Sequence, residues 1–134
     1  MDLLDTLADR SCPALVFLDA ARASVEAAAG TWQRIDYHRQ PELLARQKAP
    51  LNTHALGIAD ILELGLTLGV LPPVVWVYAA FGKQFECGAA LSDECQPLVT
   101  RVADAVEGDL QAFFAERDRT TDRPRNSGEP PCTS

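Results

Sequence analysis

Two short and almost continuous apolar runs constrain the fold of this chain more than any other feature. They are CPALVFLDA at residues 12–20 and PPVVWVYAAF at residues 72–81. Neither run shows the polar–apolar alternation of a half-solvated strand. Such runs are typical of strands that are covered on both faces, as in a parallel sheet. A weaker strand candidate, GTWQRIDY, covers residues 30–37.

Helical patterns separate these strand candidates. Apolar residues recur at helical spacing before the second apolar run, at Ala55, Ile58, Ala59, Leu62 and Leu66. Gly69 is expected to end this helix. A long helix is predicted after the loop at residues 82–94, with an apolar stripe of Leu98, Val99, Val102, Ala103, Val106, Leu110, Phe113 and Phe114. Strands that alternate with helices predict an α/β domain built on a mostly parallel sheet.

The length and composition suit one domain with a core. The chain has 134 residues, of which 47% are hydrophobic, and this is enough to bury apolar surface. We expect the α/β domain to cover residues 1–116. Residues 117–134 are charged and contain three prolines, so a disordered polar tail is predicted there.

Charge and cysteine usage limit the partners and the compartment. The formal net charge of −7 repels phosphate groups, which argues against nucleic acid and against anionic membranes as partners. The N-terminus has neither the basic segment nor the apolar segment of a secretory signal. The four cysteines match neither a zinc cluster nor a compact disulfide framework. Cys12, Cys87, Cys95 and Cys132 are therefore expected to be reduced thiols. A cytoplasmic location is expected for the protein.

Asp19 and His54 are the candidate ligands of a metal ion. Asp19 closes the first apolar run, and ligands of open α/β sheets bind beyond the carboxyl ends of the strands. A carboxylate that caps the next turn is the alternative interpretation. If Asn52 or Thr53 caps the following helix, His54 lies in its first turn, where the helix dipole favours the neutral imidazole that binds metal. A purely structural histidine is the alternative.

Other catalytic patterns are weak, and the catalytic residues stay unassigned. The sequence has no GxSxG, P-loop, GxGxxG or HExxH motif. Cys87 lies in a loop, where a pairing with either histidine is only a geometric option. His38 is expected to be a solvated loop residue. Asp93 and Glu94 are expected to serve the first turn of the last helix.

Four segments, in this order, resemble the [NiFe]-hydrogenase maturation proteases. They are VFLDA with Asp19, a (S/T)-H-x-L-G-(L/I) motif at Thr53–Ile58, an LG-x-L-P segment at Leu68–Pro72 and an F-x-x-G-x-x-L-S loop at Phe85–Ser92. The resemblance runs from about Leu3 to Phe114. Proteins of this family remove the C-terminal extension of the hydrogenase large subunit after nickel insertion.

The resemblance implies a fold, a substrate and a metal site. The fold is a twisted, mostly parallel α/β sheet with helices on both faces. The substrate is a large-subunit precursor whose nickel acts as the recognition element, and one peptide bond is hydrolysed. The family's metal ligands are a glutamate, an aspartate at a strand end and a helix-opening histidine. Asp19 and His54 match the last two.

The chain departs from the family at its N-terminus. Family members begin with a strand, a glutamate-bearing loop, a helix and a second strand that have no counterpart here, so the third ligand is missing. Asp5, Glu26 and Glu42 are the nearby carboxylates, and no sequence feature favours any of them as the third metal ligand. The missing strands are also expected to leave the strand at residues 14–19 with an uncovered edge that favours self-association.

Three hypotheses follow from these observations. The first is a maturation endopeptidase, recorded here from a late start codon. The second is a non-catalytic, truncated relative that binds the nickel-loaded precursor without cleaving it. The third is a small α/β domain whose motif matches are accidental.

Overall fold

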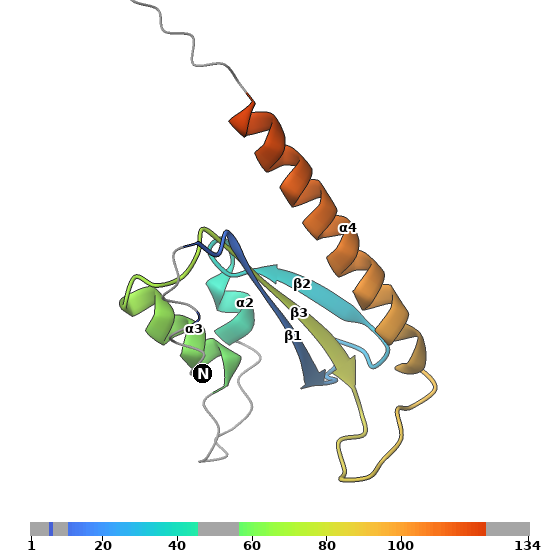
Figure 1. Ribbon diagram of the computed structural model, residues 1–134. Coiled ribbons are helices and arrows are strands. Elements are labelled where there is room, and N and C mark those ends of the chain that lie inside the picture. The colour runs from blue at the N-terminus through green and yellow to red at the C-terminus, as the bar shows by residue number, and fades with distance from the viewer. Residues whose placement is uncertain (1–5, 7–10, 46–56, 123–134) are drawn as a thin grey trace, which may run out of the picture. The chain divides into compact units, whose positions relative to one another are not determined.

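The computed structural model describes residue 6, residues 11–45 and residues 57–122 of the chain, and these form a mixed α/β fold (Figure 1). The elements follow in the order β1 (Ala14–Arg22), β2 (Trp32–Asp36), α2 (Pro41–Ala45), α3 (Ile58–Thr67), β3 (Val74–Gly82) and α4 (Gln96–Thr121). All three predicted strands are therefore confirmed. The predicted helices before and after β3 are confirmed as α3 and α4.

The strands form one small mixed sheet in the order β1-β3-β2. β3 is central and runs parallel to β1, with Phe17 opposite Val77. β2 runs antiparallel to β3 and places Ile35 opposite the same Val77. The parallel pair requires a crossover connection, and α3 lies within it. β2 joins the other edge of β3 after the connection at residues 23–31.

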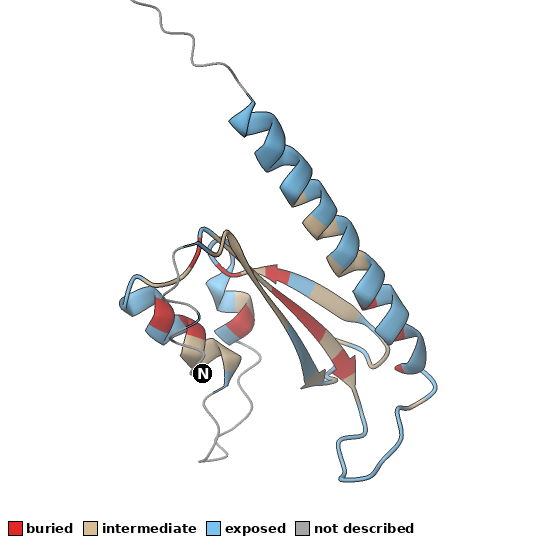
Figure 2. Cartoon of the chain, viewed as in Figure 1, coloured by how far each residue is buried: buried red, intermediate tan, exposed pale blue. Residues whose placement is uncertain are grey.

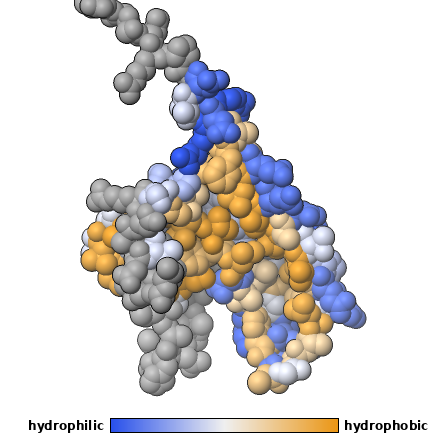
Figure 3. Space-filling model, in the orientation of Figure 1, coloured by the Kyte–Doolittle hydropathy of each residue, from blue (hydrophilic) through white to orange (hydrophobic). Residues whose placement is uncertain are grey.

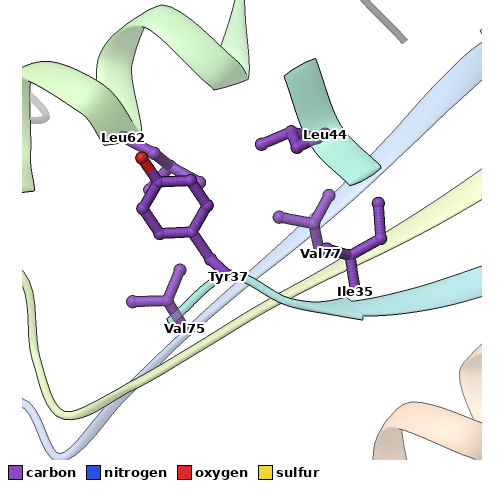
Figure 4. Packing of buried hydrophobic residues seen from close by; sticks show 6 residues of the cluster. All are labelled: Ile35, Tyr37, Leu44, Leu62, Val75 and Val77. Atoms are coloured by element: carbon purple, nitrogen blue, oxygen red, sulfur yellow. The ribbon is translucent and has the colours of Figure 1, made fainter. Parts of the chain in front are cut away.

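One face of the sheet carries the hydrophobic core. Side chains alternate between the two faces of a sheet, and the register places Phe17, Val77 and Ile35 on the same face. We call this the cluster face. Leu44 of α2 and Leu62 of α3 are buried against it (Figure 4). The other members of the cluster are Ile35, Tyr37, Val75 and Val77, and the partly buried residues packed on it are Leu15, Phe17, Leu43, Ile58, Ala59 and Leu71.

Helix α3 ends in a Schellman motif, which confirms the role predicted for Gly69. The Gly69 N–H donates to the Leu66 carbonyl at 3.1 Å and the Val70 N–H donates to the Gly65 carbonyl at 3.0 Å. Gly69 itself has a φ of +67°, which a side chain disfavours. The chain then folds back and brings Leu71 against Gly65, where a β-carbon would lie 2.7 Å from Leu71 Cδ2.

The start of α3 differs from the prediction. The N-cap is Gly57, and its N–H donates to the Asp60 carboxylate at 3.3 Å. The expectation that Asn52 or Thr53 caps this helix is therefore wrong. Asp60 at the third helical position explains the difference, because a carboxylate there can reach back to the N-cap N–H. Consequently, α3 cannot include His54 in its first turn.

The chain divides into two compact units, residues 1–102 and residues 103–134. The first part of α4 belongs to the first unit and buries Leu98 and Val102. In the second unit α4 continues to Thr121, so residues 117–121 are helical where a disordered tail was expected to begin. The predicted tail otherwise lies outside the described residues from 123 onward. No helix in the described ranges combines the length and apolarity that crossing a membrane demands.

Candidate functional site

Asp19 lies within β1 rather than at its end. The strand continues for three residues to Arg22, so the predicted position at the strand end is wrong. The Asp19 carboxylate is exposed, and its Oδ1 accepts a 2.9 Å hydrogen bond from the Ala20 N–H. This bond stays inside the strand, so Asp19 does not cap the turn that follows β1. The apolar run that predicted this strand stops at Ala20, but backbone pairing with β3 continues to Arg22, and the sequence gave no sign of that extension.

The register places Asp19 on the cluster face, two residues beyond Phe17. The first residues of α3, Ile58 and Ala59, pack on the cluster of that same face. Asp19 and the start of α3, which the histidine motif leads into, thus lie on the same face of the sheet. His54 itself lies outside the described residues, three positions before Gly57.

The loop that follows β3 contacts the end of β1. The Arg22 guanidinium lies over the Phe85 ring at 5.1 Å from its centroid. Phe85 opens the F-x-x-G-x-x-L-S loop, so this segment lies beside the carboxyl end of β1. Near the other end of the loop, Glu94 packs closely on the turn before β2. A β-carbon on Gly30 in that turn would lie only 2.8 Å from the Glu94 carbonyl oxygen.

One ion pair ties the two ends of this loop together. Lys83 Nζ donates to Glu94 Oε1 at 2.7 Å, and both side chains are exposed. This hydrogen bond with Lys83 lowers the pKa of Glu94. The same bond raises the pKa of Lys83. Glu94 was expected only to serve the first turn of α4, and a bond between residues eleven positions apart leaves no local signal in the sequence.

His38 is an exposed loop residue, as predicted, with a backbone partner that the sequence did not suggest. Its Nε2 lies 2.8 Å from the Pro72 carbonyl oxygen. Because a carbonyl can only accept, this nitrogen donates, and Nδ1 is left as the possible acceptor of a neutral ring. Pro72 precedes the amino end of β3, whereas Asp19 lies toward the carboxyl half of β1. His38 therefore lies at the amino end of β3, whereas the loop at Phe85 lies at the opposite, carboxyl end of the parallel strands β1 and β3.

Three of the four cysteines are described, and all three are free thiols. The Cys12 thiol donates to the Ala14 carbonyl at 3.0 Å, and the Cys95 thiol donates to the Phe81 carbonyl at 3.5 Å. Cys87 is exposed in the loop after β3. Cys132 lies outside the described residues.

The nearby carboxylates do not build a site by themselves. Glu42 lies in the first turn of α2, and Glu26 lies in the connection between β1 and β2. Asp5 lies outside the described residues. Within the part of the chain that the structure describes, no three histidine, cysteine, aspartate or glutamate side chains come together as a metal-binding group.

Comparison of the chain with protein-family models, with curated protein sequences and with solved structures found no match.

Proposed function

We propose that this protein is a cytoplasmic relative of the [NiFe]-hydrogenase maturation proteases and removes the C-terminal extension of a nickel-loaded large-subunit precursor. The observation that carries the proposal is the placement of Asp19 and the start of α3 on one face of the sheet. Gly57 and Ile58, the described end of the histidine motif, lead into the helix that packs on the face of Asp19, which supports a shared site.

The order and placement of the remaining motifs support the same proposal. The Leu68–Pro72 segment ends α3 and returns the chain to β3. The Phe85–Ser92 loop follows the carboxyl end of β3 and contacts Arg22 of β1. We also propose, as the resemblance implies, that the sheet is twisted and carries helices on both faces.

The chemistry of the two candidate ligands suits nickel. Imidazole nitrogen and carboxylate oxygen are both ligands of divalent nickel. Asp19 is exposed, and its hydrogen bond with Ala20 occupies Oδ1 only, so Oδ2 can meet a metal ion. The nickel belongs to the precursor, and in this proposal Asp19 and His54 recognise it there. Two protein ligands alone give weak binding, which fits transient contact with a metal that the substrate already holds.

The reaction is the hydrolysis of one peptide bond. A water oxygen adds to the carbonyl carbon, the carbon–nitrogen bond breaks, and the leaving amine takes up a proton. The role of Asp19 and His54 in this scheme is to position the precursor by its nickel, so that one bond meets the water. We assign no catalytic role to any residue.

The decisive experiment incubates the purified full chain with a nickel-loaded large-subunit precursor and measures its mass. We expect loss of the C-terminal extension, at least about 10- to 100-fold slower for Asp19→Asn and for His54→Ala, the range typical when metal affinity is impaired. His38→Ala is the matched control and should cleave like the wild type. A precursor without nickel should not be processed.

The outcomes separate the hypotheses. Nickel-dependent binding without cleavage would identify the non-catalytic relative. Cleavage that proceeds equally well in the Asp19 and His54 variants would show that the proposed site is wrong. If the chain neither binds nor cleaves the precursor, the accidental-match hypothesis remains.

A further inference from the structure

On the edge of β1 that faces away from β3, the backbone N–H and C=O groups of alternate residues point out of the sheet. The Ala23 N–H donates to the Gly82 carbonyl at 2.9 Å. In a parallel pair, alternate residues direct their N–H and C=O groups to the same neighbour, so the odd-numbered residues of β1 face β3. Even-numbered residues, such as Val16 and Leu18, therefore direct theirs outward. The bond from the Tyr37 N–H to the Val75 carbonyl agrees with this, because it turns the odd-numbered residues of β3 toward β2.

Two of the outward groups already have partners near the strand itself. The Ala20 N–H donates to Asp19 Oδ1, and the Ala14 carbonyl accepts from the Cys12 thiol. Between them lie Val16 and Leu18, with two N–H donors and two C=O acceptors. No strand among the described residues pairs with this edge, since β1 has β3 as its one neighbour in the sheet.

We propose that a second copy of this chain pairs with the edge, its β1 running antiparallel, around a twofold axis at Phe17. Val16 of each copy then lies opposite Leu18 of the other, and each pair exchanges two hydrogen bonds. The two sheets join into one continuous six-stranded sheet, in the order β2-β3-β1 followed by β1-β3-β2 of the second copy.

The groups that already have partners agree with this register. In it, the Ala20 N–H of one copy faces the Ala14 carbonyl of the other. These are the two outward groups that Asp19 and Cys12 occupy. The intermolecular ladder is therefore confined to the middle of the strand, where the groups of Val16 and Leu18 lie. An axis at Leu18 would instead place the Ala20 N–H against Val16 and would break its bond with Asp19.

The side chains favour a copy of this strand over an unrelated peptide. Leu18 lies on the face opposite the cluster face and is 63% exposed, and the view in Figure 3 shows apolar surface over the strands. In the proposed register each Leu18 covers Val16 of the other copy. The segment from Ala14 to Leu18 has no charged residue and no proline. β1 is already ordered over nine residues, so a second copy avoids the entropy that an extended peptide loses on binding.

The test uses the full chain in sedimentation velocity and amide hydrogen exchange followed by NMR. We expect a dimer that forms with increasing protein concentration and strengthens with added salt, because both copies carry a net charge of −7. Protection of the Val16 and Leu18 amides should rise with concentration. The Ala20 amide should keep the same protection throughout, because Asp19 already binds it.

Leu18→Pro removes one outward N–H from each copy and leaves the bonds with β3 intact, so the dimer dissociation constant should rise at least tenfold. Leu18→Ala is the matched control: it keeps the N–H and should weaken the dimer less. Should Leu18→Pro not fold, the exchange data on the wild type decide. A monomer at all concentrations would overturn the proposal. So would Val16 and Leu18 protection that does not change with concentration, or a folded Leu18→Pro protein that still forms the dimer.

Discussion

β1 and β3 are strands of the same length and similar apolar content, yet their environments differ. Each has nine residues. β3 buries five of them, Val75, Val77, Tyr78, Ala79 and Phe81, whereas β1 buries none (Figure 2). The difference follows from position, because β3 pairs on both sides and β1 on one. Apolar content therefore identifies a strand without telling whether it is central or at an edge, and the following substitutions probe that difference.

Proline at matched positions should give the largest effect. Val77→Pro removes an N–H that faces β2 and a side chain that is fully buried. We expect a loss of about 3–6 kcal/mol in the free energy of unfolding, from an unpaired carbonyl and lost apolar burial. Leu18→Pro should change this free energy by less than about 1 kcal/mol, since edge strands tolerate proline where the N–H faces outward. Urea denaturation of dilute protein measures both, and equal losses would contradict the assignment of β1 as an open edge.

Truncation of neighbouring side chains on β1 should give the next largest effect. Phe17 packs on the cluster, whereas Leu18 is mostly exposed. Phe17→Ala should destabilise the chain by about 2–3 kcal/mol, somewhat less than a fully buried phenylalanine. Leu18→Ala should cost less than about 0.5 kcal/mol in dilute protein. Denaturation midpoints that fall by the same amount in both variants would show that β1 is covered on both faces.

Asp19→Ala should strengthen association through the edge of β1. The substitution frees the Ala20 N–H. This N–H can then bond to the second copy's Ala14 carbonyl, whose oxygen has a second lone pair beside the one that accepts from the Cys12 thiol. Two such bonds per dimer, at a net contribution of about 0.5–1 kcal/mol each, correspond to an increase of about 5- to 30-fold in the association constant. Asp19→Asn is the control, because its amide oxygen still accepts from Ala20. Sedimentation at several concentrations measures the effect, and weaker association of Asp19→Ala would contradict the proposed role of this bond.

The smallest effect is expected where the chain leaves β3, at the exposed Lys83–Glu94 pair. The pKa of Glu94 is lowered from 4.5 and that of Lys83 is raised from 10.5. The pair therefore stabilises the fold fully between these two values. This contribution disappears as the pH falls through the lowered pKa of Glu94 or rises through the raised pKa of Lys83. Glu94→Gln should lower the thermal midpoint slightly at neutral pH, with no difference from the wild type in strong acid. A difference that persists in acid would show that the ion pair is not its cause.

Much of the fold could be predicted from the sequence, because it depends on local patterns. Apolar runs located β1 and β3, and helical spacing with Gly69 located α3 and its end. The direction of β2 and the edge position of β1 depend on pairing between distant segments, which periodicity does not encode. The start of α3 was misplaced because Thr53 is a common N-cap, whereas the structure uses Gly57 with Asp60.

The candidate site was predicted less completely than the fold. Asp19 was identified because a charged residue in an apolar run is conspicuous, but the strand extends beyond it. The bonds of His38 with Pro72 and of Lys83 with Glu94 join residues that are distant in sequence. No spacing rule relates these partners, since the fold alone brings them together.

A titration of the isotopically labelled full chain with Ni²⁺, followed by NMR, tests the central claim most directly. It monitors the Asp19 carboxyl carbon and the imidazole rings of His54 and His38. We predict that the Asp19 and His54 signals shift or broaden together, at nickel concentrations that leave His38 unchanged, and that both responses disappear in Asp19→Ala. Nickel that reaches His38 first, or that perturbs His54 without Asp19, would contradict the proposed site.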